Sequence, residues 1–351
     1  MLRNLVFAVC ALLQAAADAA LAADTSPLPP PVYTVSRSFP VAGSSGWDYL
    51  ALEASGARLF VSRSDHVDVV ETVSGRLAGT IPNTAGIHGI AFAPLLKRGF
   101  TSNGRTSTVS VFELDTLHLV QEVPVSGKQP DAILYEPRHN YVITANAESS
   151  NLSVIDAETL QVAATVPLPG PPEFMATDAA GTVFVNIETD PGKLVAVDAK
   201  TLTVKATWPL PDCANPTGLA LDVLHHRLFS VCQNQVMAVT DSLSGKHVAQ
   251  VVIGRGPDAA AFDADLGLVF SSNGLDGTLT VIHQDTPDDY RVLATVTTQV
   301  SARTMVLDPA THRIFLAAAK LGATPPATEE QPHPRPSIVP DSVGILIAQP
   351  K

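Results

Sequence analysis

The amino-acid sequence predicts an all-β fold, a seven-bladed β-propeller of four-stranded antiparallel blades. Three observations support this fold class. A repeat of 40–45 residues runs along the chain, each repeat holds four short runs of β-branched and apolar residues, and turn-forming residues separate the runs. Repeats of this length with four strands each are typical of propeller blades, because one such meander cannot bury both of its faces alone.

The clearest repeat spans residues 130–168 and contains the runs AILY, YVITA, LSVID and QVAATVPL. Pro, Asn and Asp between these runs predict tight turns. Aligned at the same position of the first strand, the seven repeats begin at Trp47, Ile87, Pro130, Pro172, Pro216, Pro257 and Ala302. Each repeat is therefore expected to form one blade, with its first strand beside the central tunnel.

The last repeat holds only three strands before the sequence reaches Lys351. Residues 33–41 (YTVSRSFPV) resemble the fourth strands of the other repeats, yet no first three strands precede them. We expect this N-terminal strand to complete the last blade, which closes the ring and removes an open sheet edge.

The segment before the repeats has the pattern of a secretory signal peptide over residues 1–23, followed by a Pro-rich spacer over 24–32. Gln14 and Asp18 interrupt the apolar run before it reaches the length of a membrane span. We therefore expect export to the periplasm or beyond, no membrane span, and one monomeric propeller domain over residues 33–351.

Three segments carry a family resemblance: NYVITANAESSNLSVIDAETLQV (140–162), RGFTSNGRTSTVSVFELDTL (98–117) and GLVFSSNGLDGTLTVI (267–282). They resemble the YVTN-type repeat of YncE-like β-propeller proteins, and the Pro-rich C-terminal part resembles a tail of secreted members. The resemblance covers the whole mature chain and implies the propeller fold. It names no activity, because such propellers include DNA binders, surface antigens and dehydrogenase subunits.

The charge balance disfavours one of these functions. The sequence has 34 Asp and Glu against 22 Lys and Arg, a formal net charge of −12. Nucleic acids and anionic lipid surfaces are bound through basic faces. The charge balance therefore argues against nucleic acid as a partner.

Two cysteines remain after removal of the predicted signal. Cys213 lies in the connection to the fifth repeat, and Cys232 ends the second strand of that repeat. The hairpin formed by the first two strands returns Cys232 to the level of Cys213, and exported proteins meet oxidising conditions. We expect a disulfide between them; the alternative is two separate buried thiols.

The second position of each aligned repeat predicts a ring of polar side chains at one mouth of the tunnel. The ring residues are Asp48, His88, Asp131, Glu173, Thr217, Asp258 and Arg303, and Trp47 and Tyr49 flank them. An acidic ring suits a cation or a polar ligand. Hard oxygen ligands with one imidazole can hold Ca²⁺, Mg²⁺ or Zn²⁺, with Asp48, His88, Asp131, Glu173 and Asp258 as the candidate ligands. The alternative is that these groups cap turns, with Arg303 paired to Asp258 or Asp48.

Two further features have structural and functional interpretations. Asn103, Asn146 and Asn273 recur after the second strand and are expected to bond backbone groups of the connection to the third. The Pro-rich loop 320–340 replaces a short connection in the last blade on the face of the ring. It forms a lid or a docking segment, or it is a surface loop that supports closure.

The sequence contains none of the standard catalytic or haem-binding motifs. The first hypothesis is therefore a non-catalytic binding or scaffold module, which takes a protein, a peptide or a small polar ligand at the acidic tunnel mouth. The alternative is a metal-dependent hydrolase or lyase similar to gluconolactonase-like propellers, with His88 as the proton carrier. The Glu, Asn and Asp ligand pattern of those enzymes has no residue-by-residue match in this chain.

Overall fold

The computed structural model describes residues 30–43, 45–328, 334 and 336–351. Residues Pro31–Lys351 form one compact unit. The predicted signal peptide (1–23) and most of the predicted spacer (24–32) lie outside the described residues. Within the described part of the chain, no helix has the length and apolar character needed to cross a membrane.

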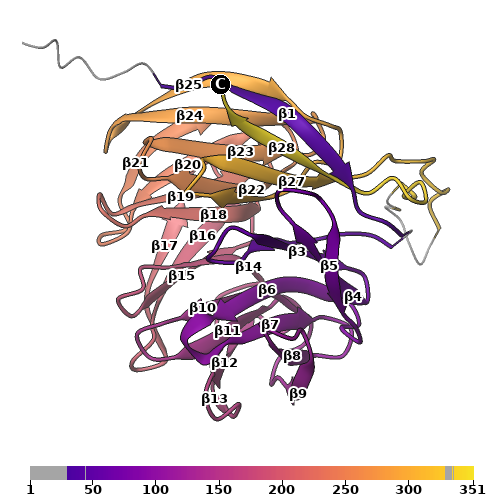
Figure 1. Cartoon of the computed structure of the whole chain (residues 1–351). Coiled ribbons are helices and arrows are strands. Elements are labelled where there is room, and N and C mark those ends of the chain that lie inside the picture. The colour runs from indigo at the N-terminus through magenta and orange to yellow at the C-terminus, as the bar shows by residue number, and fades with distance from the viewer. Residues whose placement is uncertain (1–29, 44, 329–333, 335) are drawn as a thin grey trace, which may run out of the picture. The chain divides into compact units, whose positions relative to one another are not determined.

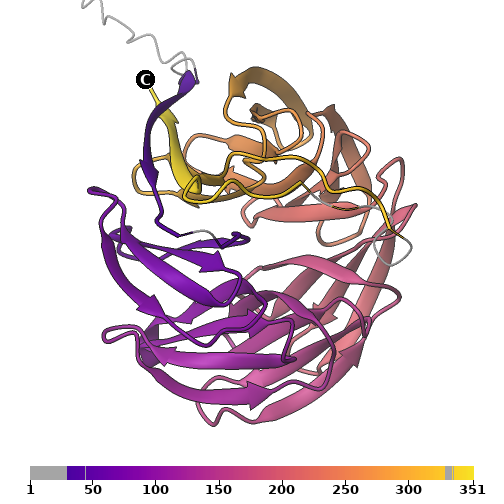
Figure 2. The same ribbon diagram turned by 90° about the vertical axis from the view of Figure 1, so that its right-hand side faces the viewer.

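The strands form seven four-stranded antiparallel sheets arranged around a central axis, which confirms the predicted propeller (Figures 1 and 2). The first blade comprises β2 (Leu50–Leu52), β3 (Arg58–Arg63), β4 (His66–Glu71) and β5 (Leu77–Ile81). The second comprises β6 (Ile87–Ala93), β7 (Arg98–Asn103), β8 (Thr108–Glu113) and β9 (Leu119–Pro124), with the 3₁₀ helix η1 (Pro94–Leu96) between β6 and β7. The third comprises β10 (Pro130–Glu136), β11 (Tyr141–Asn146), β12 (Asn151–Asp156) and β13 (Val162–Pro167).

The remaining blades follow the same order along the chain. The fourth comprises β14 (Pro172–Thr177), β15 (Thr182–Ile187), β16 (Gly192–Asp198) and β17 (Thr203–Leu210). The fifth comprises β18 (Pro216–Asp222), β19 (Arg227–Cys232), β20 (Val236–Asp241) and β21 (His247–Val252). The sixth comprises β22 (Pro257–Asp263), β23 (Leu268–Asn273), β24 (Thr278–Thr286) and β25 (Asp289–Thr297). The seventh comprises β26 (Thr304–Asp308), β27 (Arg313–Ala318), β28 (Gly344–Pro350) and β1 (Tyr33–Pro40).

The N-terminal strand closes the ring as predicted. β1 pairs antiparallel with β28, from Tyr33 opposite Pro350 to Pro40 opposite Gly344. The order in this blade is β1-β28-β27-β26, so the first strand of the chain is the outermost strand of the last blade. Figure 1 shows the indigo β1 beside the yellow β28. The pairing joins the two ends of the propeller and covers an edge of β28 that would otherwise be open.

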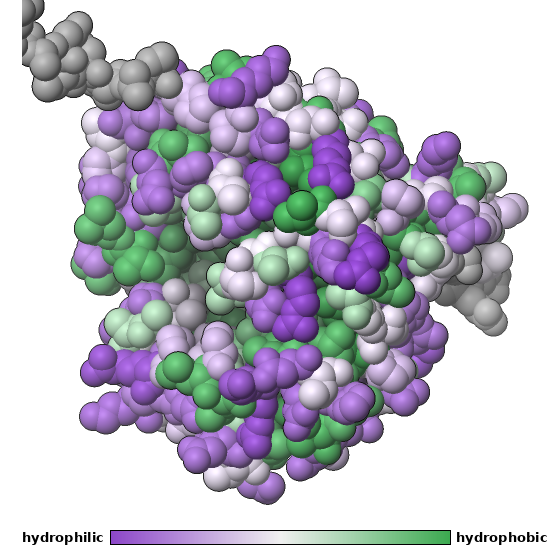
Figure 3. Space-filling view, in the orientation of Figure 1, coloured by the Kyte–Doolittle hydropathy of each residue, from purple (hydrophilic) through white to green (hydrophobic). Residues whose placement is uncertain are grey.

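The core lies between neighbouring blades. In six blades the third residue of the second strand is a buried Phe, and in the third blade it is Ile143. Phe60 of the first blade, for example, packs against Phe92 and Phe112 of the second. Because large apolar side chains at one repeated position fill each space between blades, the repeat in the sequence becomes a repeat in the core. Outside this core, hydrophilic and hydrophobic residues are interspersed over the face of the propeller that Figure 3 shows.

The recurring asparagines bond different partners from those predicted. Asn103 Nδ2 donates to Thr108 Oγ1 at 3.1 Å and to Ser110 Oγ at 2.8 Å. Asn146 and Asn273 make the same pair of contacts with the third strands of their blades. The prediction of backbone partners was wrong. Asn103 pairs directly with Thr108 across β7 and β8, so its amide reaches cross-strand side chains on the same face.

In the fifth blade this position belongs to Cys232 rather than to an Asn, since Pro216 pairs with Cys232 as Pro130 pairs with Asn146. Cys232 and Cys213 form a disulfide with their Cα atoms 5.4 Å apart, and both side chains are buried. The disulfide therefore joins the end of β19 to the connection that leads into the same blade.

Candidate functional site

A break in strand pairing positions the predicted ring. In the second to sixth blades, the first residue of the inner strand pairs with the end of the second strand, and the register then shifts. The shift falls at the ring position: His88, Asp131, Glu173, Thr217 or Asp258. A β-bulge releases a residue from the ladder and redirects its side chain. In the first and seventh blades, Asp48 and Arg303 lie just before β2 and β26 begin.

The structure brings eight of the nine predicted ring and flanking residues to one cavity of about 410 Å³, here called the tunnel cavity. These residues are Asp48, Tyr49, His88, Asp131, Glu173, Thr217, Asp258 and Arg303. Trp47 is the exception and lines an adjoining pocket. Alignment of the repeats therefore identified residues that meet in space although they lie up to 255 positions apart in the chain.

The centre of the polar cluster is His88. Its Nδ1 lies 2.7 Å from Asp48 Oδ2 and 3.7 Å from Asp131 Oδ1. One donor atom from each of these three residues lies within 4.8 Å of the others, the only grouping of this kind among the described residues. Burial opposes the charged ring, but the bond to Asp48 and the charge of Asp131 raise the pKa of His88 overall.

Arg303 supplies the resident positive charge. Its Nη1 lies 2.7 Å from Asp258 Oδ2, and its Nη2 lies 3.3 Å from Asp48 Oδ1. The pairing that we considered as an alternative for this residue thus occurs with both neighbours. Arg303 connects the sixth, seventh and first blades across the seam, and it neutralises part of the acidic cluster.

The carboxyl groups of Asp131 and Glu173 are poorly neutralised. Burial, with the charges of Asp48 and Asp258 acting in the same direction, raises the pKa of Asp131 to about 6, although His88 opposes the shift. Burial and the charge of Asp131 raise the pKa of Glu173 well above its usual value. The Tyr49 hydroxyl bonds Asp131, and its own pKa is raised by burial and by Asp131. The raised pKa values of the two carboxyl groups therefore reflect burial first and repulsion among the neighbouring carboxylates second.

Thr217 has a structural role within the ring. Its hydroxyl lies 3.0 Å from the carbonyl oxygen of Pro257 and 3.3 Å from that of Val231, so it ties the fifth blade to the sixth. The side chain is almost fully buried. Thr217 therefore positions the ring more than it offers a hydroxyl to a ligand.

Sequence reasoning missed several residues of the tunnel cavity. Gln129, Phe174, Glu188 and Gln233 also line it. Phe174 directly follows the ring residue Glu173 and stacks on Tyr49 with ring centroids 5.5 Å apart. Gln129 precedes an inner strand, whereas Glu188 and Gln233 follow second strands. All four residues are sequence neighbours of aligned positions, and this adjacency is the signal by which they could have been predicted.

The candidate metal ligands fit a metal only in part. Asp48, His88 and Asp131 offer two oxygens and one nitrogen, a donor set compatible with Zn²⁺ or with a harder cation. Glu173 and Asp258 do not belong to this group of three. His88 already bonds Asp48, and Arg303 contacts the other oxygen of that carboxylate. A metal held here would have to replace the His88–Asp48 hydrogen bond.

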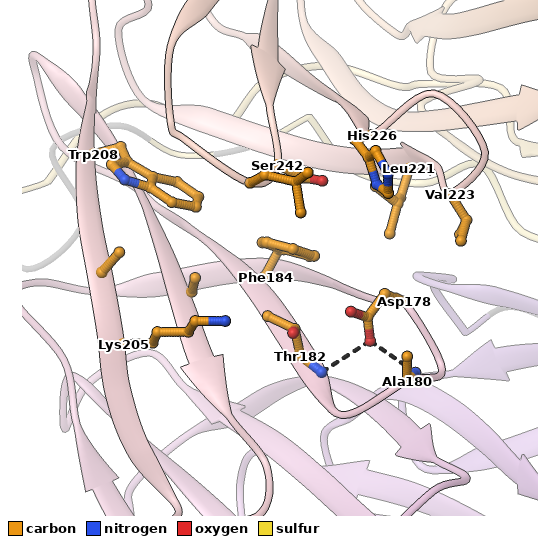
Figure 4. A pocket seen from close by; sticks show the side chains of 13 residues that line it. Asp178, Ala180, Thr182, Phe184, Lys205, Trp208, Leu221, Val223, His226 and Ser242 are labelled. Carbon is orange, nitrogen blue, oxygen red and sulfur yellow. Dashed lines mark hydrogen bonds between the residues drawn. The ribbon is translucent and has the colours of Figure 1, made fainter.

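Another cavity, of about 400 Å³, lies between the fourth and fifth blades and does not share residues with the ring. Figure 4 shows Trp208 and Phe184 as its aromatic walls, with Lys205 and Asp178 at its lower side. Asp178 Oδ1 accepts hydrogen bonds from the backbone N–H groups of Ala180 and Thr182, both at 2.8 Å. Because this carboxylate stabilises a turn, the tunnel cavity remains the better candidate site.

Comparison with known proteins supports the fold and no activity. No family model matches the chain, and no curated protein matches it. Among many similar solved structures is the one titled Kuenenia stuttgartiensis hydrazine synthase. The TM-score is 0.70 at 15% sequence identity, over 79% of this chain and 94% of that chain. A likeness at this identity shows a shared propeller fold only.

Proposed function

We propose that the chain is a binding module that takes a cation, inorganic or organic, in the tunnel cavity. The observation that carries this proposal is the charge imbalance at the site. Four ring carboxylates line one cavity, and the resident cationic groups are Arg303 and, when protonated, His88. A bound cation relieves repulsion among the carboxylates and favours the ionised forms of Asp131 and Glu173, whose pKa values are raised in its absence.

A second candidate function is a metal-dependent hydrolase or lyase, favoured by the grouping of Asp48, His88 and Asp131. A metal bound there would polarise a carbonyl group and lower the pKa of a bound water molecule. The proton-carrier role of His88 requires a free ring nitrogen. Since Nδ1 bonds Asp48, only Nε2 can exchange a proton with a substrate.

The proposal also covers the family of the protein and the compartment in which it acts. We propose an exported, YncE-like propeller of the periplasm or the extracellular space. The leader-like residues 1–23 and the YVTN-type segments support this assignment. The buried Cys213–Cys232 disulfide is consistent with an oxidising compartment. Cleavage near residue 23 in secreted protein, determined by N-terminal sequencing, is the expected result.

The binding proposal is tested by calorimetric titration of the protein with Ca²⁺, Zn²⁺ and methylammonium at pH 7.5. At least one of these cations should bind at one per chain and raise the melting temperature. Asp131→Asn and Glu173→Gln should weaken that binding about tenfold or more, since each removes a charge from the cavity. Asp115→Asn is the matched control, because Asp115 is exposed and pairs with Lys97 away from the cavity.

Failure of all three cations to bind would overturn the proposal. Equal binding by wild type and Asp131→Asn would place the cation elsewhere and would also overturn it. Metal binding accompanied by hydrolysis of a lactone or ester, lost in Asp131→Asn and retained in Asp115→Asn, would favour the second candidate.

A further inference from the structure

A second pocket adjoins the tunnel cavity. It has a volume of about 460 Å³ and is here called the loop pocket, because Leu321, Pro336 and Ile338 of the Pro-rich loop contribute to its lining. Gln233, Asp258 and Arg303 line both the loop pocket and the tunnel cavity. The two spaces are therefore neighbours with a common polar boundary on the ring face of the propeller.

The outer part of the loop pocket is apolar. Leu275 is 66% exposed, Val300 is 52% exposed and Leu321 is 40% exposed, and all three line the pocket. Trp47 and Ile338 contribute further apolar surface. Exposed aliphatic side chains that gather beside a polar cavity are a common feature of sites for amphipathic ligands.

The Pro-rich loop is anchored where it forms this wall. Leu321 and Ile338 form an antiparallel bridge, Gly322 N donates to Ser337 O at 2.8 Å, and Val339 N donates to Lys320 O at 2.9 Å. Ile338 also packs against the core cluster of the first and last blades. Figure 2 shows the yellow segment lying across part of the ring face. The described ends of the loop are thus a fixed wall of the pocket.

The tunnel cavity contains groups that suit an ammonium ion. The stacked rings of Tyr49 and Phe174 line it together with Asp131 and Glu173. Aromatic faces next to carboxylates favour organic cations, which gain cation–π attraction as well as charge pairing. A bare metal ion would use neither the aromatic pair nor the apolar loop pocket.

We propose that the tunnel cavity and the loop pocket bind the two ends of one ligand, an organic ammonium ion with an aliphatic or aromatic arm. This inference rests on the proposed cation-binding function and specifies its ligand class. The ammonium group lies against Asp131, Glu173 and the Tyr49–Phe174 pair. The arm passes Arg303 and lies against Leu275, Val300 and Leu321.

Calorimetric titration with methylammonium and n-butylammonium at pH 7.5 tests the proposal. The affinity for butylammonium should be at least about tenfold higher than that for methylammonium, because each buried methylene group raises the affinity by up to about fourfold. In Leu275→Ser and Leu321→Ser the ratio of the two affinities should fall towards one. Leu95→Ser is the matched control, since Leu95 is 95% exposed and lines neither pocket, and it should keep the wild-type ratio.

Each other outcome overturns a defined part of the proposal. Equal binding of the two ammonium ions by wild type would exclude the loop pocket as a subsite and leave the cation-binding function intact. A preference for butylammonium that persists in both serine variants would place the arm elsewhere. Binding of Ca²⁺ or Zn²⁺ without binding of either ammonium ion would reject the ligand class alone, whereas failure of all cations would reject the cation-binding function as well.

Discussion

His88 of the second blade donates a hydrogen bond from Nδ1 to Asp48 of the first blade, over 2.7 Å. This bond orients the imidazole towards Asp131 of the third blade, 3.7 Å away. Three successive blades thereby contribute to one cluster of coupled charges. The protonation of this cluster depends on pH near neutrality, so both the stability of the protein and its affinity for cations should do so too.

The free energy of unfolding without ligand should fall as pH rises from about 5 to about 7.5. The pKa of Asp131 is about 6 in the folded protein, above its usual value of 3.8. The folded state therefore retains the proton more strongly than the unfolded state, and this stabilisation is lost as pH rises through about 6. The whole shift corresponds to about 3 kcal/mol, lost between pH 3.8 and about 7, so roughly half of it falls between pH 5 and 7.5. The raised pKa of His88 acts in the same direction.

Urea unfolding of wild type and Asp131→Asn at several pH values measures this effect. The variant should show a smaller loss of stability over the same pH range, because the amide that replaces the Asp131 carboxyl group does not titrate. Parallel pH profiles for the two proteins would contradict the assignment of the effect to Asp131.

Replacement of Arg303 should increase the excess of negative charge in the tunnel cavity. Arg303→Met removes the positive charge that pairs with Asp258 and Asp48. Breaking such partly buried pairs should cost about 2–4 kcal/mol at pH 7.5, since the remaining carboxylates repel one another. The variant should bind Ca²⁺ more tightly than wild type, and saturating Ca²⁺ should recover part of the lost melting temperature. Weaker Ca²⁺ binding by Arg303→Met would indicate that Arg303 orders the site and does not compete for it.

Much of this arrangement could be predicted from the sequence, because every blade uses the same hydrogen-bond register. Pro130 and Pro257 each pair with the Asn that ends the second strand, so equivalent positions in the sequence are equivalent in space. The blade number, the strand that closes the ring and the members of the ring all follow from that equivalence. Trp47 does not line the tunnel cavity, and neither do the residues aligned with it, including Ile87, Pro130 and Pro257. The first aligned position therefore lies outside the cavity in every blade.

Contacts formed by irregular segments could not be predicted in this way. Arg63 occupies the strand-end position that Asn103 and Asn146 occupy in the following blades, and its side chain is fully buried. Its guanidinium donates to Asp68 and to the backbone carbonyl groups of Ala42, Gly43, Ser45 and Gly46. Those carbonyl groups belong to the connection from β1 to β2, which is longer than the equivalent connections that lead into the other blades.

Arg63 should be among the most sensitive positions for stability. Arg63→Met should lower the free energy of unfolding by about 3–5 kcal/mol, because it removes the arginine that pairs with Asp68 and leaves several loop carbonyl groups without a donor. Thermal and urea denaturation measure the loss. Arg37→Met is the control, since Arg37 is exposed on β1, and should change stability by less than about 0.5 kcal/mol. Equal effects of the two substitutions would show that the buried network adds little to stability.

Loss of the disulfide should destabilise the fifth blade. Cys213 and Cys232 are 19 positions apart, and a covalent loop of this length contributes about 3 kcal/mol. The double variant Cys213→Ser, Cys232→Ser should therefore melt at a lower temperature than wild type. Addition of dithiothreitol should lower the melting temperature of wild type towards that of the variant and leave the variant unchanged. Two free thiols per unreduced chain, measured with a thiol reagent under denaturing conditions, would contradict the disulfide.

The stability of the closed ring should depend on Tyr33 of β1, the strand that pairs with β28. The Tyr33 hydroxyl donates to the carbonyl oxygen of His312 at 2.8 Å, and its ring packs edge-on against Phe270 of the sixth blade with centroids 5.0 Å apart. Tyr33→Phe should cost about 1 kcal/mol through loss of the hydrogen bond, whereas Tyr33→Ala should cost about 3–5 kcal/mol through the cavity it leaves. Ser38→Ala, at an exposed position of the same strand, should be nearly neutral. Urea unfolding of the three variants tests this order, and a Tyr33→Ala protein as stable as wild type would mean that the propeller stays closed without the packing of β1.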